Sequence, residues 1–182
     1  FRLEHMKNKA IFLHRDGVII EDTHYIKSLD EVKIYDFSKE AIDIFKKLGY
    51  IIIVISNQSA IARKMTTIEE VEKINKYLKD TLKFDDIFFC PHIEREKVVK
   101  ENEYTINCNC RKPNTLLGEK AVKKYNINVN NSFMVGDRET DILFGKNLGV
   151  KTVFIYNDIK VNSDYTFNNL LEFAKHLERY NI

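Results

Sequence analysis

Two carboxylates lie at the ends of short apolar segments, where a chain could do chemistry. Asp16 closely follows the apolar residues 10–13, Asp137 directly follows residues 133–136, and a glycine adjoins each aspartate. Singly, either Asp-Gly pair is typical of a turn. Together, Asp16 and Asp137 are candidate ligands of Mg²⁺, a hard cation that prefers carboxylates, carbonyls and water. Position 14, two residues before Asp16, holds His14. Asp141 either orients the loop after Asp137 or caps the next helix, and we favour the cap.

Donors for an anion occur at similar places. The candidates are Ser56, Asn57, Gln58 and Ser59, which follow the apolar residues 51–55, and the neighbouring pair Arg111 and Lys112. Hydroxyl, amide and backbone N–H groups at a strand end can surround a phosphate oxygen, and a guanidinium beside an ammonium suits an anionic substrate. Each set alone is typical of a polar loop or solvated surface. Beside a cation site at the same strand ends, both favour a bound phosphate.

All three cysteines and one histidine form two pairs with a spacing of two, namely Cys90 with His92 and Cys108 with Cys110. Three thiolates and an imidazole complete a tetrahedral Zn²⁺ shell with no open position, which is typical of a structural site. Scattered free cysteines are the less probable interpretation, because every cysteine of the chain takes part. We therefore predict a zinc-binding loop at residues 90–110 that positions Arg111 and Lys112.

Apolar runs of strand length alternate with segments of helical periodicity. The predicted strands are 10–13, 51–55, 87–90, 133–136 and 152–156, and the predicted helices are 41–48, 67–83, 114–125, 140–148 and 168–180. Continuous hydrophobicity over about five residues suits strands buried on both faces of a parallel sheet. The pattern predicts an α/β fold, a three-layer doubly wound parallel sheet of the Rossmann-like type, with ligands at the carboxyl ends of the strands.

Composition restricts the class of protein. The chain has 182 residues, 44% of them hydrophobic and 31% charged, with a formal charge of +2. This balance is globular and lacks the basic excess of a nucleic-acid binder. The longest apolar run is too short to cross a bilayer. We expect a cytoplasmic monomer with one domain at residues 7–182, and we interpret residues 1–6 as the remnant of an expression tag followed by the native start, Met6.

The motifs resemble a known enzyme family when taken in order. They read His-Arg-Asp-Gly-Val-Ile, Ser-Asn-Gln-Ser-Ala-Ile-Ala-Arg, Cys-Pro-His, Cys-Asn-Cys-Arg-Lys-Pro and Val-Gly-Asp-Arg-Glu-Thr-Asp. This set is similar to the D-glycero-D-manno-heptose 1,7-bisphosphate phosphatases of the haloacid dehalogenase superfamily and to the related histidinol-phosphate phosphatases. Residues 57–63 and 22–25 resemble the heptose branch, whereas residues 136–141 resemble the histidinol branch. The heptose interpretation leads.

The resemblance implies a fold without a large cap domain and a role for each motif. The group at position 14 attacks phosphorus, and Asp16 protonates the leaving alcohol and then activates water. Ser56 and Lys112 stabilise the transferring phosphoryl group. The sugar and its distal phosphate are held by Arg111, Arg138 and the loop of Asp22, Thr23, His24 and Tyr25. Mg²⁺ is bound at position 14, Asp16 and Asp137. The implied reaction removes the C7 phosphate during the synthesis of activated heptose for lipopolysaccharide or capsule.

His14 departs from this pattern, because the family has an aspartate there. The change removes the nucleophile and one Mg²⁺ ligand together, and covalent catalysis fails without an activated nucleophile. Three interpretations remain open: an active phosphohistidine, an introduced or accidental substitution, and a natural sugar-phosphate-binding homologue without catalysis. We rank the active phosphohistidine below the other two and predict a weakly active or inactive phosphatase.

Overall fold

Six parallel strands form one sheet in the computed structural model, which describes residues 7–180. The strands are β1 (Ala10–Leu13), β2 (Ile51–Asn57), β3 (Asp86–Cys90), β4 (Phe133–Gly136), β5 (Lys151–Ile155) and β6 (Tyr165–Phe167). Their order across the sheet is β3-β2-β1-β4-β5-β6. The connections therefore run one way from β1 to β3 and the other way from β4 to β6, which places a topological switch point beside β1.

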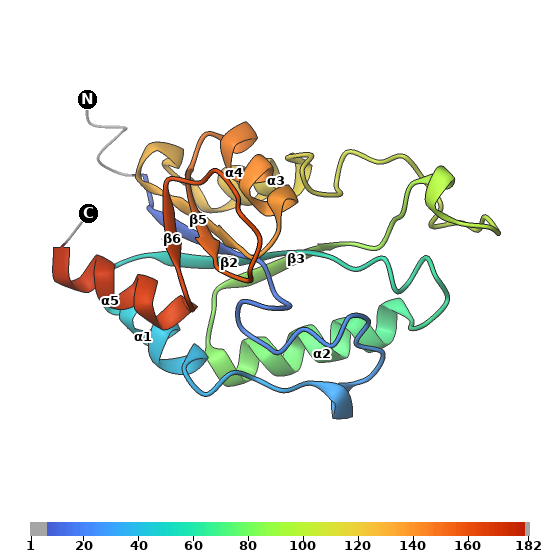
Figure 1. The fold of residues 1–182 in the computed structure, drawn as a ribbon, viewed down its shortest axis with the longest axis horizontal. Coiled ribbons are helices and arrows are strands. Elements are labelled where there is room, and N and C mark those ends of the chain that lie inside the picture. The colour runs from blue at the N-terminus through green and yellow to red at the C-terminus, as the bar shows by residue number, and fades with distance from the viewer. Residues whose placement is uncertain (1–6, 181–182) are drawn as a thin grey trace.

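Helices cover both faces of this sheet (Figure 1). They are α1 (Ser38–Lys47), α2 (Ile68–Leu82), α3 (Leu116–Tyr125), α4 (Glu139–Leu148) and α5 (Leu170–Tyr180). The buried faces of α1, α2 and α5 pack on one side of the sheet, and those of α3 and α4 pack on the other. Helix α2 begins where the Thr67 side chain accepts a hydrogen bond from Glu70 N, and it ends at Lys83 with a left-handed backbone. The three-layer α/β prediction is confirmed.

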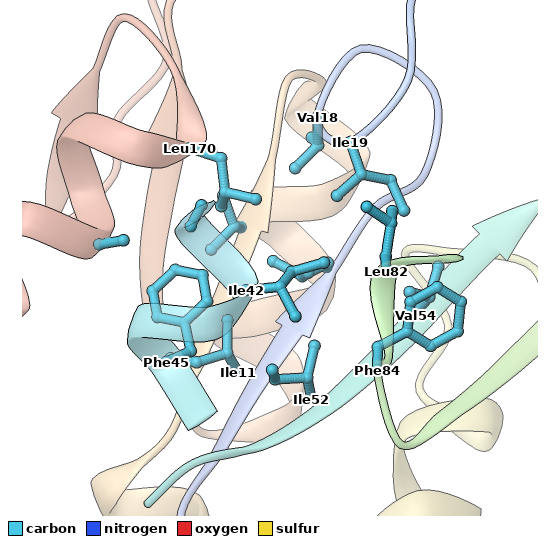
Figure 2. Packing of buried hydrophobic residues seen from close by; sticks show 14 of the residues in the cluster. Ile11, Val18, Ile19, Ile42, Phe45, Ile52, Val54, Leu82, Phe84 and Leu170 are labelled. Carbon is cyan, nitrogen blue, oxygen red and sulfur yellow. The ribbon is translucent and has the colours of Figure 1, made fainter. Parts of the chain in front are cut away.

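The core on the α1 side is built from strand residues that alternate toward it. Figure 2 shows Ile11 of β1 and Ile52 of β2 facing Ile42 and Phe45 of α1. All four side chains are fully buried. Burying a side chain of this size stabilises the fold by about 1.5–3 kcal/mol relative to leaving it in water. This packing fixes the ends of β1 and β2, from which the site residues project.

The structure adds one strand to the prediction. β6 was not expected, and it pairs with β5 at the edge of the sheet. The loop predicted at residues 90–110 leaves β3 at Cys90 and extends away from the sheet, with one short 3-10 helix at Arg95–Lys97 (Figure 1). Within residues 7–180, no connection carries a large cap domain, as the resemblance implied. The interpretation of residues 1–6 lies outside the described residues.

No helix in the described part of the chain is both long enough and apolar enough to cross a membrane.

Candidate active site

A cavity of about 600 Å³ opens near the carboxyl ends of β1, β2 and β4. Its wall contains many of the side chains that the sequence singled out: His14, Asp16, His24, Tyr25, Asn57, Gln58, Ser59, Arg111, Lys112 and Arg138. Four predicted residues, Ser56, Asp22, Thr23 and Asp137, are not part of this wall. The sheet thus brings together motifs that lie far apart in sequence, because parallel strands end at the same edge.

His14 lies at the base of the cavity and is only 4% exposed. Its Nδ1 accepts a hydrogen bond from Lys112 Nζ at 2.8 Å, while Nε2 lies 3.9 Å from Asp137 Oδ1. Burial lowers the pKa of His14 to about 4, so the imidazole is neutral at physiological pH. With Nδ1 accepting, the single ring proton is on Nε2. Position 14 therefore offers an uncharged nitrogen base where the related family has a carboxylate.

A buried ion pair adjoins this histidine. Lys112 Nζ lies 2.7 Å from Asp141 Oδ1, and each side chain is 1% exposed. Lys112 Nζ also donates to the carbonyl of Ile55 at 2.7 Å. Burial lowers the pKa of Lys112 and is opposed by Asp141. For Asp141, burial alone raises the pKa, but the electrostatic interactions with His14 and Lys112 and the hydrogen bond from Lys112 outweigh it, so the net shift of the pKa is downward.

Asp141 caps the next helix, as the sequence analysis favoured, and also pairs with Lys112. Its Oδ2 accepts a hydrogen bond from Arg138 N at 3.2 Å and so caps the first turn of α4. Its other oxygen faces Lys112. The predicted cap is confirmed, whereas the spacing along α4 could not reveal the ion pair with Lys112.

Asp16 is held by a residue that the sequence analysis missed. Arg15 is 1% exposed, and its Nε donates to Asp16 Oδ1 at 3.0 Å. The same guanidinium donates to Gln58 Oε1 at 3.1 Å and to Asn75 Oδ1 of α2 at 3.0 Å. Burial raises the pKa of Asp16, but the charge of Arg15 and its hydrogen bond lower the pKa by more than burial raises it. The net shift is downward, so the carboxyl is ionised at neutral pH. The only signal was a charged residue inside an otherwise apolar stretch.

Two residues of the predicted phosphate loop have structural partners. Ser56 is the penultimate residue of β2 and is fully buried, and its hydroxyl accepts a hydrogen bond from Gln58 Nε2. Asn57 Oδ1 accepts from Lys112 N at 2.9 Å, and its Nδ2 donates to Lys112 O at 3.3 Å. Asn57 therefore ties the end of β2 to the backbone of the zinc-binding loop, and Ser56 lies beneath the cavity wall.

Asp137 is 8% exposed, and its Oδ1 is a buried oxygen without a hydrogen-bond partner among the described residues. Burial, with a contribution from Asp141, raises the pKa of Asp137 to about 7. Gly17 has φ of +86°, and a Cβ at this position would collide with the Asp137 carboxylate. The orphaned oxygen fits a cation ligand. The adjacent imidazole does not fit Mg²⁺, which binds oxygen ligands in near-ideal octahedral geometry.

The loop of residues 22–25 approaches the cavity from the side of β4. Asp22 Oδ2 accepts a hydrogen bond from Arg138 Nη2 at 3.3 Å, and the Tyr25 ring lies under the Arg63 guanidinium, 5.4 Å from ring centroid to Cζ. His24 has φ of +71°, which turns the chain at this point. Arg63 also lines the cavity and was not among the predicted residues. Thr23 does not contribute to the cavity wall.

Arg111 also lines the cavity and is held there by contacts with the cysteine-bearing loop. Its Nε lies 3.4 Å from Glu94 Oε2, and its Nη1 donates to His92 O at 3.4 Å. Glu94 itself is a cavity residue that the sequence did not indicate. Both contacts connect Arg111 to the loop that carries the cysteines, so the position of this guanidinium depends on the shape of that loop.

The predicted zinc ligands converge. Cys110 Sγ lies 3.0 Å from Cys90 Sγ and 3.3 Å from Cys108 Sγ, and His92 Nδ1 lies 3.2 Å from Cys110 Sγ. One central ion with bonds of about 2.3 Å to sulfur and about 2.0 Å to nitrogen needs an outward shift of only a few tenths of an ångström. The donor set therefore fits Zn²⁺, which supplies a structural cross-link when bound.

Comparisons with known proteins show which family this chain resembles. The hydrolase-like family model, described as "HAD-hyrolase-like", matches residues 109–172. D-glycero-beta-D-manno-heptose-1,7-bisphosphate 7-phosphatase from Pasteurella multocida is 33% identical over 92% of this chain and 95% of that protein. The histidine biosynthesis bifunctional protein of Campylobacter jejuni is 34% identical over 80% of this chain, which spans 41% of that protein.

Solved structures show the same fold. A crystal structure of D,D-heptose 1,7-bisphosphate phosphatase from B. bronchiseptica, complexed with magnesium and phosphate, superposes with a TM-score of 0.80. It covers 94% of this chain and 98% of its own, at 22% identity. Given the similarity to the Pasteurella multocida protein over nearly the full length of both, this chain belongs to the D-glycero-D-manno-heptose 1,7-bisphosphate phosphatase family of the haloacid dehalogenase superfamily.

Proposed function

We propose that this protein is built to remove the C7 phosphate from D-glycero-D-manno-heptose 1,7-bisphosphate, and that His14 strongly impairs this reaction. The carrying observation is the convergence of Asp16, Lys112 and Asp137 around position 14 at the base of one cavity. The relatedness to heptose bisphosphate phosphatases supports the substrate class. The product would feed the synthesis of activated heptose for surface polysaccharide.

The site supports binding and positioning of a sugar phosphate. Arg111, Arg138 and Arg63 place guanidinium groups on the cavity wall, and guanidinium groups bind phosphate oxygens in pairs. Lys112 Nζ has three donors, and the described structure shows three partners: His14, Ile55 and Asp141. A phosphate that contacts Lys112 would compete with these three partners, of which His14 and the Ile55 carbonyl are uncharged. We assign to Asp16, which Arg15 holds in place, the exchange of a proton with the leaving alcohol or with water.

The chemical step lacks its usual nucleophile. Removing a nucleophile costs on the order of 10⁶-fold in turnover in serine proteases. We expect a deficit of several orders of magnitude here, because the carboxylate that would attack phosphorus is replaced by a buried imidazole. The fold and the zinc-binding loop do not depend on this group, so binding of phosphate compounds is expected to persist.

Phosphate release tests the proposal. This chain and its His14→Asp variant are incubated with heptose 1,7-bisphosphate or histidinol phosphate and Mg²⁺. We expect release by the Asp form with the heptose substrate, at least ~10³-fold faster than by the His form. Asp16→Asn on the His14→Asp background should abolish it, and Asp30→Asn, an exposed aspartate outside the cavity wall, should not.

Each outcome is decisive. Equal rates from both forms would show that His14 is no impairment and that His14 itself or some other group attacks phosphorus. A preference of the Asp form for histidinol phosphate would move the chain to the second branch. Inactivity of both forms, with tight binding of sugar phosphate by each, would establish a binding protein without catalysis.

A further inference from the structure

The exchange of a carboxylate for an imidazole changes which cation the base of the cavity can hold. His14 Nε2 and Asp137 Oδ1 lie 3.9 Å apart. Nitrogen and oxygen ligands bond to a transition metal at about 2.0–2.2 Å, so one ion can bridge atoms at this separation with little movement. Asp137 Oδ1 is buried without a hydrogen bond among the described residues, and a cation would satisfy it.

The far side of the ring also suits a metal-binding histidine. Asp141 Oδ1 lies 3.8 Å from His14 Nδ1. Histidines that bind a metal through one nitrogen usually donate the other ring N–H to a carboxylate, which fixes the tautomer. Metal binding at Nε2 moves the ring proton to Nδ1, and Asp141 can then accept a hydrogen bond from this N–H. Lys112 then gives up its hydrogen bond to His14 and keeps its contacts with Asp141 and the carbonyl of Ile55.

Ligand preference separates the candidate metals. Imidazole suits Zn²⁺, Co²⁺, Ni²⁺ and Fe²⁺, whereas Mg²⁺ prefers oxygen ligands throughout. The geometry points to a borderline divalent transition metal, of the class of Zn²⁺ and Co²⁺, bound between His14 and Asp137 in place of Mg²⁺. This inference rests on the proposed function only in treating the cavity as the metal-dependent site of the family. It states a metal specificity that His14 gives to this chain.

Cobalt is a suitable probe, because its absorption reports the ligands. The protein, with its cysteine loop loaded with one equivalent of Zn²⁺, is titrated with Co²⁺ while the visible and near-ultraviolet spectra are recorded. A thiolate-bound Co²⁺ gives a strong charge-transfer band, and a site of nitrogen and oxygen ligands gives only weak visible bands. We expect a second metal equivalent with weak visible bands and no thiolate band, and little competition from excess Mg²⁺.

Two variants test the ligands directly. His14→Asp should weaken Co²⁺ binding at this site at least tenfold and make it sensitive to Mg²⁺, and Asp137→Asn should weaken it by about 10–100-fold. His176→Gln, on α5 away from the cavity, is the matched control and should bind as the unmodified chain does. Thermal unfolding of each variant verifies that it is folded, and His14→Gln replaces any variant that is not.

Three results would overturn the inference: Co²⁺ binding that survives both His14→Asp and His14→Gln, equal competition by Mg²⁺ with His or Asp at position 14, or binding seen only as a thiolate band. None of these measurements uses turnover. If His14→Asp proves inactive as a phosphatase while the cobalt result holds, the proposed function fails and the metal site stands.

Discussion

Replacing Lys112 by methionine is expected to destabilise the protein by about 3–5 kcal/mol. The ammonium lies 2.7 Å from Asp141 Oδ1, and both side chains are 1% exposed. At this distance the attraction is about 6 kcal/mol for an effective dielectric constant near 20, and desolvation of the two charges offsets part of it. Methionine keeps the length of the side chain but leaves the Asp141 charge buried without its cation, which is the costly situation for a buried pair.

Asp141→Asn completes a double-mutant cycle. Asparagine retains an oxygen that can accept the hydrogen bond from Arg138 N, so the cap of α4 survives and mainly the charge is lost. Each single variant should lose about 3–5 kcal/mol. The double variant should lose less than either single variant, because it leaves no unpaired buried charge.

Urea unfolding measures these values. With a slope of about 2 kcal/mol per molar, the single variants should unfold at roughly 2 M lower urea. Lys76→Met is the control, since Lys76 pairs with Asp80 at 2.6 Å but the side chains are 78% and 61% exposed. It should cost less than about 0.5 kcal/mol. The reasoning is refuted if Lys112→Met costs no more than Lys76→Met, or if the losses of the two single variants simply add.

Two further predictions concern other parts of the molecule. Cys110→Ser should raise the amide hydrogen exchange of residues 91–111 by at least ~10-fold, while β1 and β2 stay protected, since the loop depends on its cross-link and the sheet does not; unchanged exchange in the loop would show that zinc does not order it. Asp86→Asn should cost about 1 kcal/mol at neutral pH, because burial raises the pKa of Asp86 but the hydrogen bonds from Lys124 and Tyr125 outweigh it and lower the pKa overall. For such a carboxyl the stabilisation is fully present above the unfolded pKa of about 3.9 and is lost as the pH falls through the lower folded pKa. Urea unfolding should therefore show a smaller difference in the free energy of unfolding between the two proteins at pH 3 than at pH 7. An equal difference at both pH values would contradict this assignment.

Most of the sheet was predictable because its inner strands are continuous apolar runs. Residues 10–13 and 133–136 are buried on both faces, and burial of that kind requires an unbroken hydrophobic sequence. β6 escaped prediction because its three residues, Tyr-Thr-Phe, are partly exposed at an edge and carry too short a pattern. Its pairing depends on β5, which is a contact between segments and not a property of the local sequence.

The candidate site, like the sheet, was predictable from the sequence only in part. The convergence of the three cysteines and His92 was predicted from spacing alone, since two pairs of donors leave few other arrangements. The roles of Asn57 and Asp141 could not be predicted, because each depends on a hydrogen bond or ion pair to Lys112, which lies 55 residues after Asn57 and 29 before Asp141 in the numbering. Pattern reasoning locates strand ends, but it does not say which polar side chains point into the cavity and which support its wall.

The guanidinium of Arg15 has a consequence for the evolution and engineering of this cavity. It joins Asp16 to Asn75, a residue of α2 that is 4% exposed and does not line the cavity. A change at Asn75 would therefore redirect the carboxylate of Asp16, to which we assign proton transfer, without altering any contact to a ligand. Variants of altered rate or selectivity should accordingly be sought on the buried face of α2 as well as among the side chains that a substrate touches.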